Sequence, residues 1–255
     1  MRNPLPGLLV PFQRVYYYGL RYQCPFCHSR LRKFLPYGVD HPVLKKLGVL
    51  SAGRRANARC PCCGSLDRER LLYLYLLYKT STFLEPLKLL HLAPEKPLQR
   101  ILCKQHHIDY VTADLYRVDV MVKADINSLP FPVNSFDGVI CNHVLEYIED
   151  DRKALAEIRR VLRSGGWAIL MEQIVPSLET TYEDSRHVTP AERNAAYGDP
   201  GHRRLYGRDY QERIAEMGFG VEVFQRPTDD TFFGGPTNTF GLLEGESVYI
   251  AFKGS

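Results

Sequence analysis

The sequence predicts an α/β protein in which a small cysteine-stapled module precedes a larger domain built on a mainly parallel sheet. Three observations support this fold class. Apolar strand-like runs alternate with helix-like segments from residue 67 onward, glycines follow two of the predicted helices, and two Cys-Pro-x-Cys units lie within the first 66 residues. Strands that alternate with helices at this spacing are typical of a parallel, doubly wound sheet. We therefore expect a module over residues 1–66 and a domain over residues 67–255.

The two Cys-Pro-x-Cys units predict a metal site in the module. Each unit turns tightly, so that its two thiolates point toward one spot, and four thiolates in tetrahedral geometry are the ligands that a structural Zn²⁺ prefers. Unpaired buried cysteines and disulfides are the alternatives, and the lack of a secretory signal pattern favours the metal. The expected zinc ligands of this zinc-ribbon module are Cys24, Cys27, Cys60 and Cys63.

Basic residues are concentrated in the module. Residues 1–60 contain eleven Arg or Lys and one acid, Asp40, which gives a net charge of +10, whereas the remaining residues carry −6. A basic, aromatic-rich module could bind RNA, a phosphorylated metabolite or an anionic lipid surface, or could dock on the acidic larger domain. No apolar run reaches 18 residues, and prolines interrupt the short apolar start, so we expect a cytoplasmic protein without a membrane span.

The apolar pattern after residue 66 predicts the elements of the larger domain. A buried helix over residues 71–80 comes first, after a charged turn. The following helices are expected at 95–105, 150–162 and 210–217, and the strands at 88–93, 110–114, 136–142, 167–174, 221–224 and 248–252. Gly165 and Gly166 follow the second of these helices and Gly218 follows the third, where each would act as a C-terminal stop.

Side chains at the ends of these strands predict a ligand site, because parallel sheets of this kind bind ligands at their carboxyl edge. Ala93 follows the first strand and is small enough to let a ligand approach the backbone. Asp114 ends the second strand, where an acid suits the two hydroxyls of a ribose. Asp125 could then accept from an adenine amino group, while Ile126 covers the ring.

The stretch between residues 125 and 170 also carries a specific family resemblance. It contains residues 125–132 (DINSLPFP), 135–148 (SFDGVICNHVLEYI) and 157–166 (EIRRVLRSGG). These segments resemble class I S-adenosylmethionine-dependent methyltransferases of type 11, and the likeness extends from about residue 88 to the end. The resemblance implies a Rossmann-like, seven-stranded sheet with an antiparallel final hairpin and S-adenosyl-L-methionine as the cofactor.

The same resemblance implies the residues that bind the cofactor. They are His91, Ala93, Pro94, Glu95, Asp114, Leu115, Asp125, Ile126, Asn142 and His143. One departure is the first loop, where the family usually has an acidic, glycine-rich Glu/Asp-x-Gly-x-Gly and this chain reads HLAPE over residues 91–95. Glycine permits positive φ at such a turn, whereas Ala93 offers only its small size and Pro94 has no N–H to donate. We interpret the loop as an adapted form, with a non-catalytic binding protein as the alternative.

A polar connection over residues 175–206 predicts a substrate lid, because connections of this length inside a compact domain are usually functional. His202 is the candidate general base and His187 a weaker one. Tyr182, Glu183, Arg204 and Tyr206 are expected to shape the acceptor pocket. The predicted reaction is methyl transfer to a small-molecule acceptor, with a hydroxyl of a sugar or another metabolite favoured. The alternative is an RNA methyltransferase that grips nucleic acid with the basic module.

Overall fold

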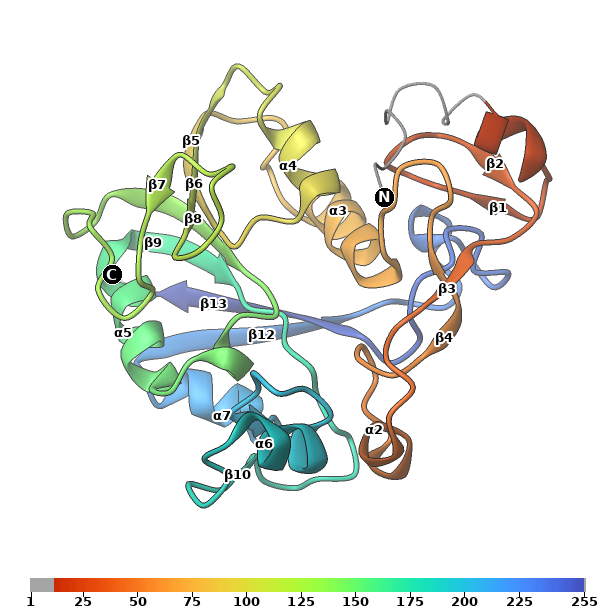
Figure 1. The fold of residues 1–255 in the computed structure, drawn as a ribbon. Helices are drawn as coiled ribbons and strands as arrows, with labels where there is room; N and C mark the ends of the chain where they lie inside the picture. Colours follow the sequence, from red (N-terminus) through yellow and green to blue (C-terminus); the bar gives the residue numbers. More distant parts are fainter. Residues whose placement is uncertain (1–11, 255) are drawn as a thin grey trace. The chain divides into compact units, whose positions relative to one another are not determined.

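The structure, a computed structural model, describes residues 12–254, and the chain divides into two compact units (Figure 1). The smaller unit contains the residues up to Gly38 together with Arg54–Phe83 and Arg226–Glu246. The larger unit contains Val39–Gly53, Leu84–Gln225 and the chain from Ser247. The sequence prediction places one boundary near residue 66, whereas the two units interleave along the chain.

Short hairpins and one long helix build the smaller unit. Its elements are β1 (Tyr22–Gln23), β2 (Arg30–Leu31), β3 (Leu35–Tyr37), β4 (Arg55–Arg59), α3 (Asp67–Lys79) and the 3₁₀ helix η2 (Thr231–Phe233). β1 pairs with β2 and β3 with β4, both antiparallel. The first turn of α3 is held by Glu69, whose Oε2 accepts from the N–H of Leu66 at 3.0 Å. The expected buried helix therefore begins earlier than residue 71, because its charged first turn supplies its own cap.

Arg70 on α3 connects three segments of the smaller unit. The side chain is fully buried, and its guanidinium lies over the ring of Phe34, with Cζ 3.9 Å from the ring centroid. It donates to the carbonyls of Ala58, Ser65, Phe240 and Gly241 at 2.6–3.0 Å. Residues 226–246 belong to this unit because their carbonyls are needed to satisfy a buried cation.

The larger unit is built on a seven-stranded sheet in the order β12-β13-β9-β8-β5-β6-β7. The strands are β5 (Leu87–Leu92), β6 (Ile108–Asp114), β7 (Val122–Lys123), β8 (Phe136–Cys141), β9 (Leu162–Ile169), β12 (Phe219–Gln225) and β13 (Ser247–Lys253). Five strands from β9 to β7 run parallel, and β13 pairs antiparallel with both β9 and β12. This confirms the α/β fold class and the antiparallel final hairpin. The strand order reverses between β5 and β8, where such sheets bind ligands.

Helices α4 (Lys96–Leu102), α5 (Asp151–Val161) and α7 (Tyr210–Ala215) connect the strands. α5 buries Ala154, Leu155, Ile158 and Val161, whose spacing places them on one face of a helix. These side chains join strand residues such as Val139 in one apolar core. The sheet therefore forms where the sequence places uninterrupted apolar runs.

β9 begins five residues earlier than the sequence predicts. α5 ends at Val161, and Leu162 is already extended, with φ −71° and ψ 141°. Gly165 has a φ of 75°, and the pairing of β9 with β8 shifts register in this region. A Cβ on Gly166 would lie 2.9 Å from the carbonyl oxygen of Asp137. The glycine pair thus forms an irregularity inside a strand and not the predicted helix cap.

The connection over residues 175–206 has its own secondary structure. It contains β10 (Tyr182–Glu183), α6 (Pro190–Tyr197) and β11 (Arg204–Leu205), and α6 begins with a Thr189–Glu192 capping box. Helix α2 (Pro42–Leu47) contacts it through a small apolar cluster of Leu44, Val49, Val175, Tyr197 and Leu205. This contact explains why Val39–Gly53 belongs to the larger unit. Within the described residues, every helix is too short or too polar to cross a membrane.

Candidate functional site

A cavity of about 420 Å³ opens at the carboxyl ends of β5, β6 and β8. Six of the predicted cofactor residues line it, namely Ala93, Asp114, Leu115, Asp125, Ile126 and His143. Tyr147 and Gly201 line it as well, and the sequence analysis did not single them out for this cavity. At the switch point of the sheet, the structure therefore brings together residues from Ala93 to Gly201, which are far apart in sequence.

The other four predicted cofactor residues lie behind the cavity wall. His91 is fully buried, and its Nε2 lies 2.7 Å from Oε2 of Glu95. Asn142 donates to Oε1 of Glu95 at 3.1 Å and accepts from the N–H of Met171 at the same distance. Burial acts to raise the pKa of Glu95, but the hydrogen bonds from His91 and Asn142 outweigh it and hold this pKa at about 2. These groups, together with the buried Pro94, position the loop and do not line the cavity.

Ala93 has the backbone conformation that the family's glycine would supply. Its φ is 46°, in the left-handed region, and its N–H donates to the carbonyl of Ala113 at 2.9 Å. His143 across the cavity also has a positive φ, 53°, and donates its N–H to Met171 at 2.7 Å. Non-glycine residues in this region are strained and cluster at functional sites. The HLAPE loop therefore keeps the tight turn although it lacks the glycine.

Asp114 and Ile126 provide the polar and apolar walls that a nucleoside needs. Oδ1 of Asp114 accepts from the N–H groups of Tyr116 and Arg117 at 2.6 and 2.8 Å, which fixes the carboxylate at the end of β6. These two bonds leave Oδ2 available. Ile126 is buried at the cavity wall beside the exposed Asp125. An acid, an apolar surface and a closely approachable backbone fit the ribose, adenine and methionine parts of S-adenosylmethionine.

A buried group of histidines and carboxylates lies next to this cavity. Nδ1 of His143 is 3.5 Å from Oε1 of Glu146, and Nε2 of His202 is 4.0 Å from the same oxygen. Glu172 lies within 4.8 Å of His143 and Glu146, measured between ligand atoms. The ring of His202 packs edge-on against Tyr147, with centroids 4.6 Å apart, and burial lowers the pKa of His202.

Sequence reasoning singled out His143 and His202 but missed Glu146 and Glu172. Glu146 follows His143 by three residues within the HVLEY stretch and lies in the 3₁₀ helix η1 (Leu145–Tyr147), which begins two residues after His143. Glu172 lies just past the end of β9, at the same carboxyl edge of the sheet. An acidic residue that directly follows a strand of a parallel sheet is a candidate ligand-binding residue, and this was the signal in the sequence that could have identified Glu172.

The predicted acceptor residues are divided between structural and exposed positions. Arg204 is buried and donates to Glu183 at 2.8 Å and to the carbonyls of Leu145, Ile148 and Glu149. The hydroxyl of the fully buried Tyr206 donates to Asp151 at 2.7 Å. These bonds anchor β11, so both side chains position the connection. Tyr206 is fully buried, whereas Arg204 also lines a polar cavity together with Glu183.

His187 lines a second cavity, away from the buried group that contains His202. A polar cavity of about 650 Å³ is lined by residues of the 175–206 connection and by Glu149, and His187 and Glu183 are among them. Nε2 of His187 is 2.9 Å from the hydroxyl of Tyr182. Of the two histidines that the sequence analysis proposed as bases, only His202 is near the predicted cofactor residues.

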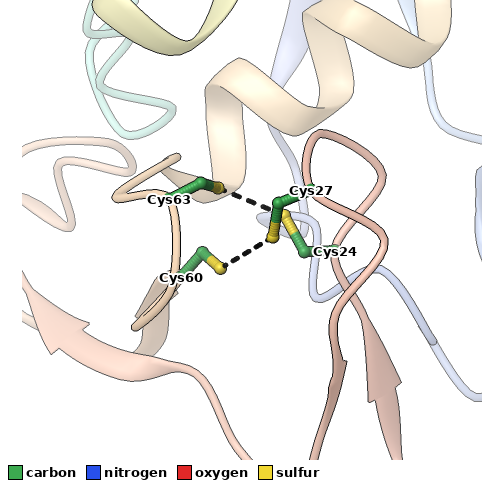
Figure 2. A group of neighbouring side chains, drawn as sticks. All are labelled: Cys24, Cys27, Cys60 and Cys63. Atoms are coloured by element: carbon green, nitrogen blue, oxygen red, sulfur yellow. Dashed lines mark hydrogen bonds between the residues drawn. The ribbon is translucent and has the colours of Figure 1, made fainter. Parts of the chain in front are cut away.

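The four predicted zinc ligands form a cluster in the smaller unit, which Figure 2 shows. The Sγ atoms of Cys24 and Cys63 are 3.6 Å apart, and those of Cys27 and Cys60 are 3.8 Å apart. These distances are far beyond the about 2.05 Å bond of a disulfide. Four sulfurs at about 2.3 Å from one tetrahedral ion lie about 3.8 Å from one another. The donor set and its spacing therefore fit a metal ion.

The two cysteine units have the same backbone. The N–H of His28 donates to the carbonyl of Cys24, and that of Gly64 donates to the carbonyl of Cys60, at 2.8 and 3.0 Å. His28 has a φ of 55° at the position where Gly64 has 82°. Ser29 and Ser65 then contact the sulfurs of Cys27 and Cys63, each at 3.3 Å. The sequence analysis missed these serines, although each occurs two residues after the second cysteine of its unit.

Residues 97–170 match a protein family described as a methyltransferase domain. The matched stretch runs from α4 to the end of β9 and contains Asp114, Asp125 and His143 of the cavity. These residues are therefore part of a methyltransferase domain.

The chain is also similar in sequence to segments of curated proteins. A ubiquinone/menaquinone biosynthesis C-methyltransferase, UbiE, from Francisella philomiragia is 39% identical over 66 residues, 25% of this chain and 26% of that protein. An uncharacterized methyltransferase, YcgJ, from Bacillus subtilis is 34% identical over 77 residues, 30% of this chain and 28% of that protein. An uncharacterized protein in a transposon of Streptomyces fradiae is 39% identical over 85 residues, 31% of this chain and 24% of that protein. The similar segments thus span about a quarter of each relative's length.

The fold of the chain is similar to that of a solved cyclase, SpnF. The TM-score is 0.50 at 17% identity, and the match covers 73% of this chain and 81% of that chain. At this identity the similarity shows the fold alone. Because one fold supports different reactions, the chemistry of the methyltransferase domain depends on its site residues.

Proposed function

We propose that this protein is an S-adenosylmethionine-dependent methyltransferase that acts on a small-molecule acceptor. The observation that carries the proposal is the cavity at the sheet's switch point, which combines Ala93, Asp114 and Ile126. The family match over residues 97–170 and the similarity to segments of known methyltransferases support it. Asp114 would hold the ribose, Asp125 and Ile126 the adenine, and the Ala93 turn the methionine end.

The bound cofactor supplies a methyl group that is already activated by a sulfonium centre. The chain's own residues therefore have two tasks, which are to align the acceptor and, for a hydroxyl acceptor, to take its proton. We assign to His202 the role of the general base that takes this proton. Burial keeps its imidazole neutral near pH 7, and Glu146, 4.0 Å away, favours the protonated form that proton uptake would create. His187 is the weaker candidate because it lies at the other cavity.

We further propose that the cluster of Cys24, Cys27, Cys60 and Cys63 holds a structural Zn²⁺. The cluster consists of four sulfur donors, and a ligand set made only of sulfur is typical of closed, non-catalytic zinc sites. The hydroxyls of Ser29 and Ser65 support the sulfurs from outside the cluster. Such an ion would stabilise the smaller unit, whose hairpins are too short to be stable alone.

Calorimetry with S-adenosylhomocysteine tests the cofactor assignment. Wild-type protein should bind it, and Asp114→Asn should weaken binding by about 1–3 kcal/mol because one charged acceptor of the ribose hydroxyls is lost. Asn keeps an Oδ1 that can accept from Tyr116 and Arg117, so the turn should survive. Asp109→Asn, at an exposed position of β6, is the matched control and should bind S-adenosylhomocysteine like the wild type. Absence of binding to the wild type would contradict the proposal, and salt-sensitive RNA binding by the wild type would redirect the acceptor class to nucleic acid.

A further inference from the structure

We propose that His143, Glu146 and Glu172 form a binding site for a divalent cation at the edge of the cofactor cavity. The role that we give to this cation, which is to hold an oxygen of the methyl acceptor, rests on the proposed methyltransferase function. The existence of the site does not depend on that function, and the experiment below separates the two.

The geometry of the three side chains fits one ion. One ligand atom from each residue lies within 4.8 Å of the others, and Nδ1 of His143 is 3.5 Å from Oε1 of Glu146. Nitrogen and oxygen ligands at about 2.0–2.2 Å from one ion are at most about 4.4 Å apart, so only small side-chain adjustments are needed. One imidazole and two carboxylates suit first-row ions such as Mn²⁺, Fe²⁺ or Zn²⁺.

Burial and charge favour a cation at this place. Glu146 and Glu172 are each 1% exposed, so two carboxylates are close to each other and removed from water. Like charges at this separation cannot both persist in a buried place without a cation or a proton between them. The neighbouring Arg204 directs its guanidinium to Glu183 and to the carbonyls of Leu145, Ile148 and Glu149.

A second observation points to a missing ligand. Among the described residues, Oε2 of Glu172 and both ring nitrogens of His202 are buried and have no hydrogen-bond partner. Buried polar atoms are almost always satisfied by protein, water or an ion. A cation bound by Glu172 would satisfy its Oε2, and a ligand on that cation would give His202 a partner.

The protein holds these ligands in place. Oε1 of Glu172 accepts from the N–H groups of Val144 and Leu145, at 3.3 and 3.1 Å, which links the end of β9 to η1. The N–H of His143 donates to Met171 at 2.7 Å. Two backbone connections therefore keep the three ligands at the carboxyl edge of adjacent strands. Such outer contacts are what fixes the orientation of metal ligands.

The position of His143 defines the class of acceptor. His143 lines the cofactor cavity while its ring belongs to the ligand group, so an ion there would border the space that an acceptor must enter. A bound cation lowers the pKa of a coordinated oxygen. The site would therefore favour an acceptor with an ionisable hydroxyl that can coordinate the ion, and His202 would be near enough to take its proton.

Titration with Mn²⁺ tests the site without any activity assay. Full-length protein is first given one equivalent of zinc per chain, which the four thiolates bind in preference to an imidazole–carboxylate site. It is then titrated with MnCl₂, and free Mn²⁺ is measured by its room-temperature EPR signal. Thiolates prefer Zn²⁺ over Mn²⁺, so the cysteine cluster will not take up the probe. We expect about one bound Mn²⁺ per chain, and Glu172→Gln should weaken this binding about 10-fold or more. Gln retains an oxygen that can accept from Val144 and Leu145.

The controls separate loss of a ligand from loss of structure. Glu222→Gln, at an exposed position of β12, should bind Mn²⁺ like the wild type. Trp167 fluorescence and S-adenosylhomocysteine binding report whether each variant is folded, and Glu146→Gln replaces Glu172→Gln if the latter does not fold. A wild type that retains no Mn²⁺, or a folded ligand variant that retains it as well as Glu222→Gln, overturns the proposal. Mn²⁺ binding without S-adenosylhomocysteine binding would leave the cation site standing and contradict the methyltransferase function.

Discussion

Trp167 lies directly against Gly138 across the parallel pair of β8 and β9. The two residues are register partners, and a Cβ on residue 138 would lie 2.7 Å from Cζ2 of the indole. The chain has one tryptophan, so this contact also places the protein's only indole fluorophore in the central sheet of the larger unit.

Gly138→Ala should destabilise the larger unit by about 1–3 kcal/mol, because the added methyl group must displace the indole or shift the strand. Urea unfolding followed by Trp167 fluorescence measures the change. Gly220→Ala on β12 is the matched control, since a Cβ there meets no atom within 4 Å. Equal midpoints for the two variants would show that the indole moves aside without cost.

Loss of one cysteine ligand should release the metal. The wild type should contain about one zinc per chain, bound by the four thiolates, and Cys63→Ser should contain none. Without the ion, the amides of the smaller unit should exchange their hydrogens faster. Cys62→Ser is the control, because this buried neighbour is not part of the cluster and its variant should keep the zinc. The measurement is the zinc content per chain of both variants, each purified without chelator. A zinc-loaded Cys63→Ser protein would count against the site.

Acid should destabilise the larger unit partly through Glu95. Its pKa is about 2 in the folded protein against 4.5 for an ordinary Glu, so its ionised form is favoured by folding. This contribution is complete above pH 4.5 and is lost as pH falls toward 2, by about 3 kcal/mol at most. Unfolding followed by Trp167 at several pH values should show a shallower acid decline for Glu95→Gln than for the wild type. Glu222→Gln, which alters an exposed acid, should decline like the wild type.

His202→Gln should retain affinity for S-adenosylhomocysteine and lose about 10²–10⁴-fold in turnover, because a general base is removed while the cofactor cavity is kept. Formation of S-adenosylhomocysteine from S-adenosylmethionine, with a metabolite extract as the source of acceptor, provides the rate. His187→Gln is the matched control and should have a normal rate, since His187 lies at the other cavity. If both variants have a normal rate, His202 is not the general base, and the alignment of acceptor and cofactor is sufficient for methyl transfer.

The sheet and the cysteine cluster could be predicted because local patterns specify them. Apolar runs such as Phe136–Cys141 form strands wherever they are buried, and a Cys-Pro-x-Cys unit brings its two sulfurs together by its own turn. The resemblance, which extends from about residue 88, together with the positions at strand ends, then predicted Asp114, Asp125 and Ile126 as cofactor residues, and these three line one cavity. These predictions did not require knowledge of contacts between distant segments.

The parts that were missed depend on such contacts. Glu172 joins His143 only after β8 and β9 have paired, and its place after a strand does not show in the sequence which residues it will meet. Arg204 was expected to shape the acceptor pocket, and it lines the polar cavity. Its hydrogen bonds to the backbone carbonyls of residues 145–149 were not predicted. The same reason explains residues 226–246, which the sequence assigns to the larger domain and whose carbonyls bind Arg70.

The interleaving of the two units bears on the order of events while the ribosome makes the chain. Arg70 is synthesised early, but the carbonyls of Phe240 and Gly241 that it requires emerge about 170 residues later. The cysteine hairpins can therefore capture a metal ion well before the unit around them can close. β13, which completes the sheet, follows within a few residues of that closure. A nascent chain stopped before residue 240 would consequently expose two unfinished cores at once, and neither unit offers a point at which synthesis could pause on a finished domain.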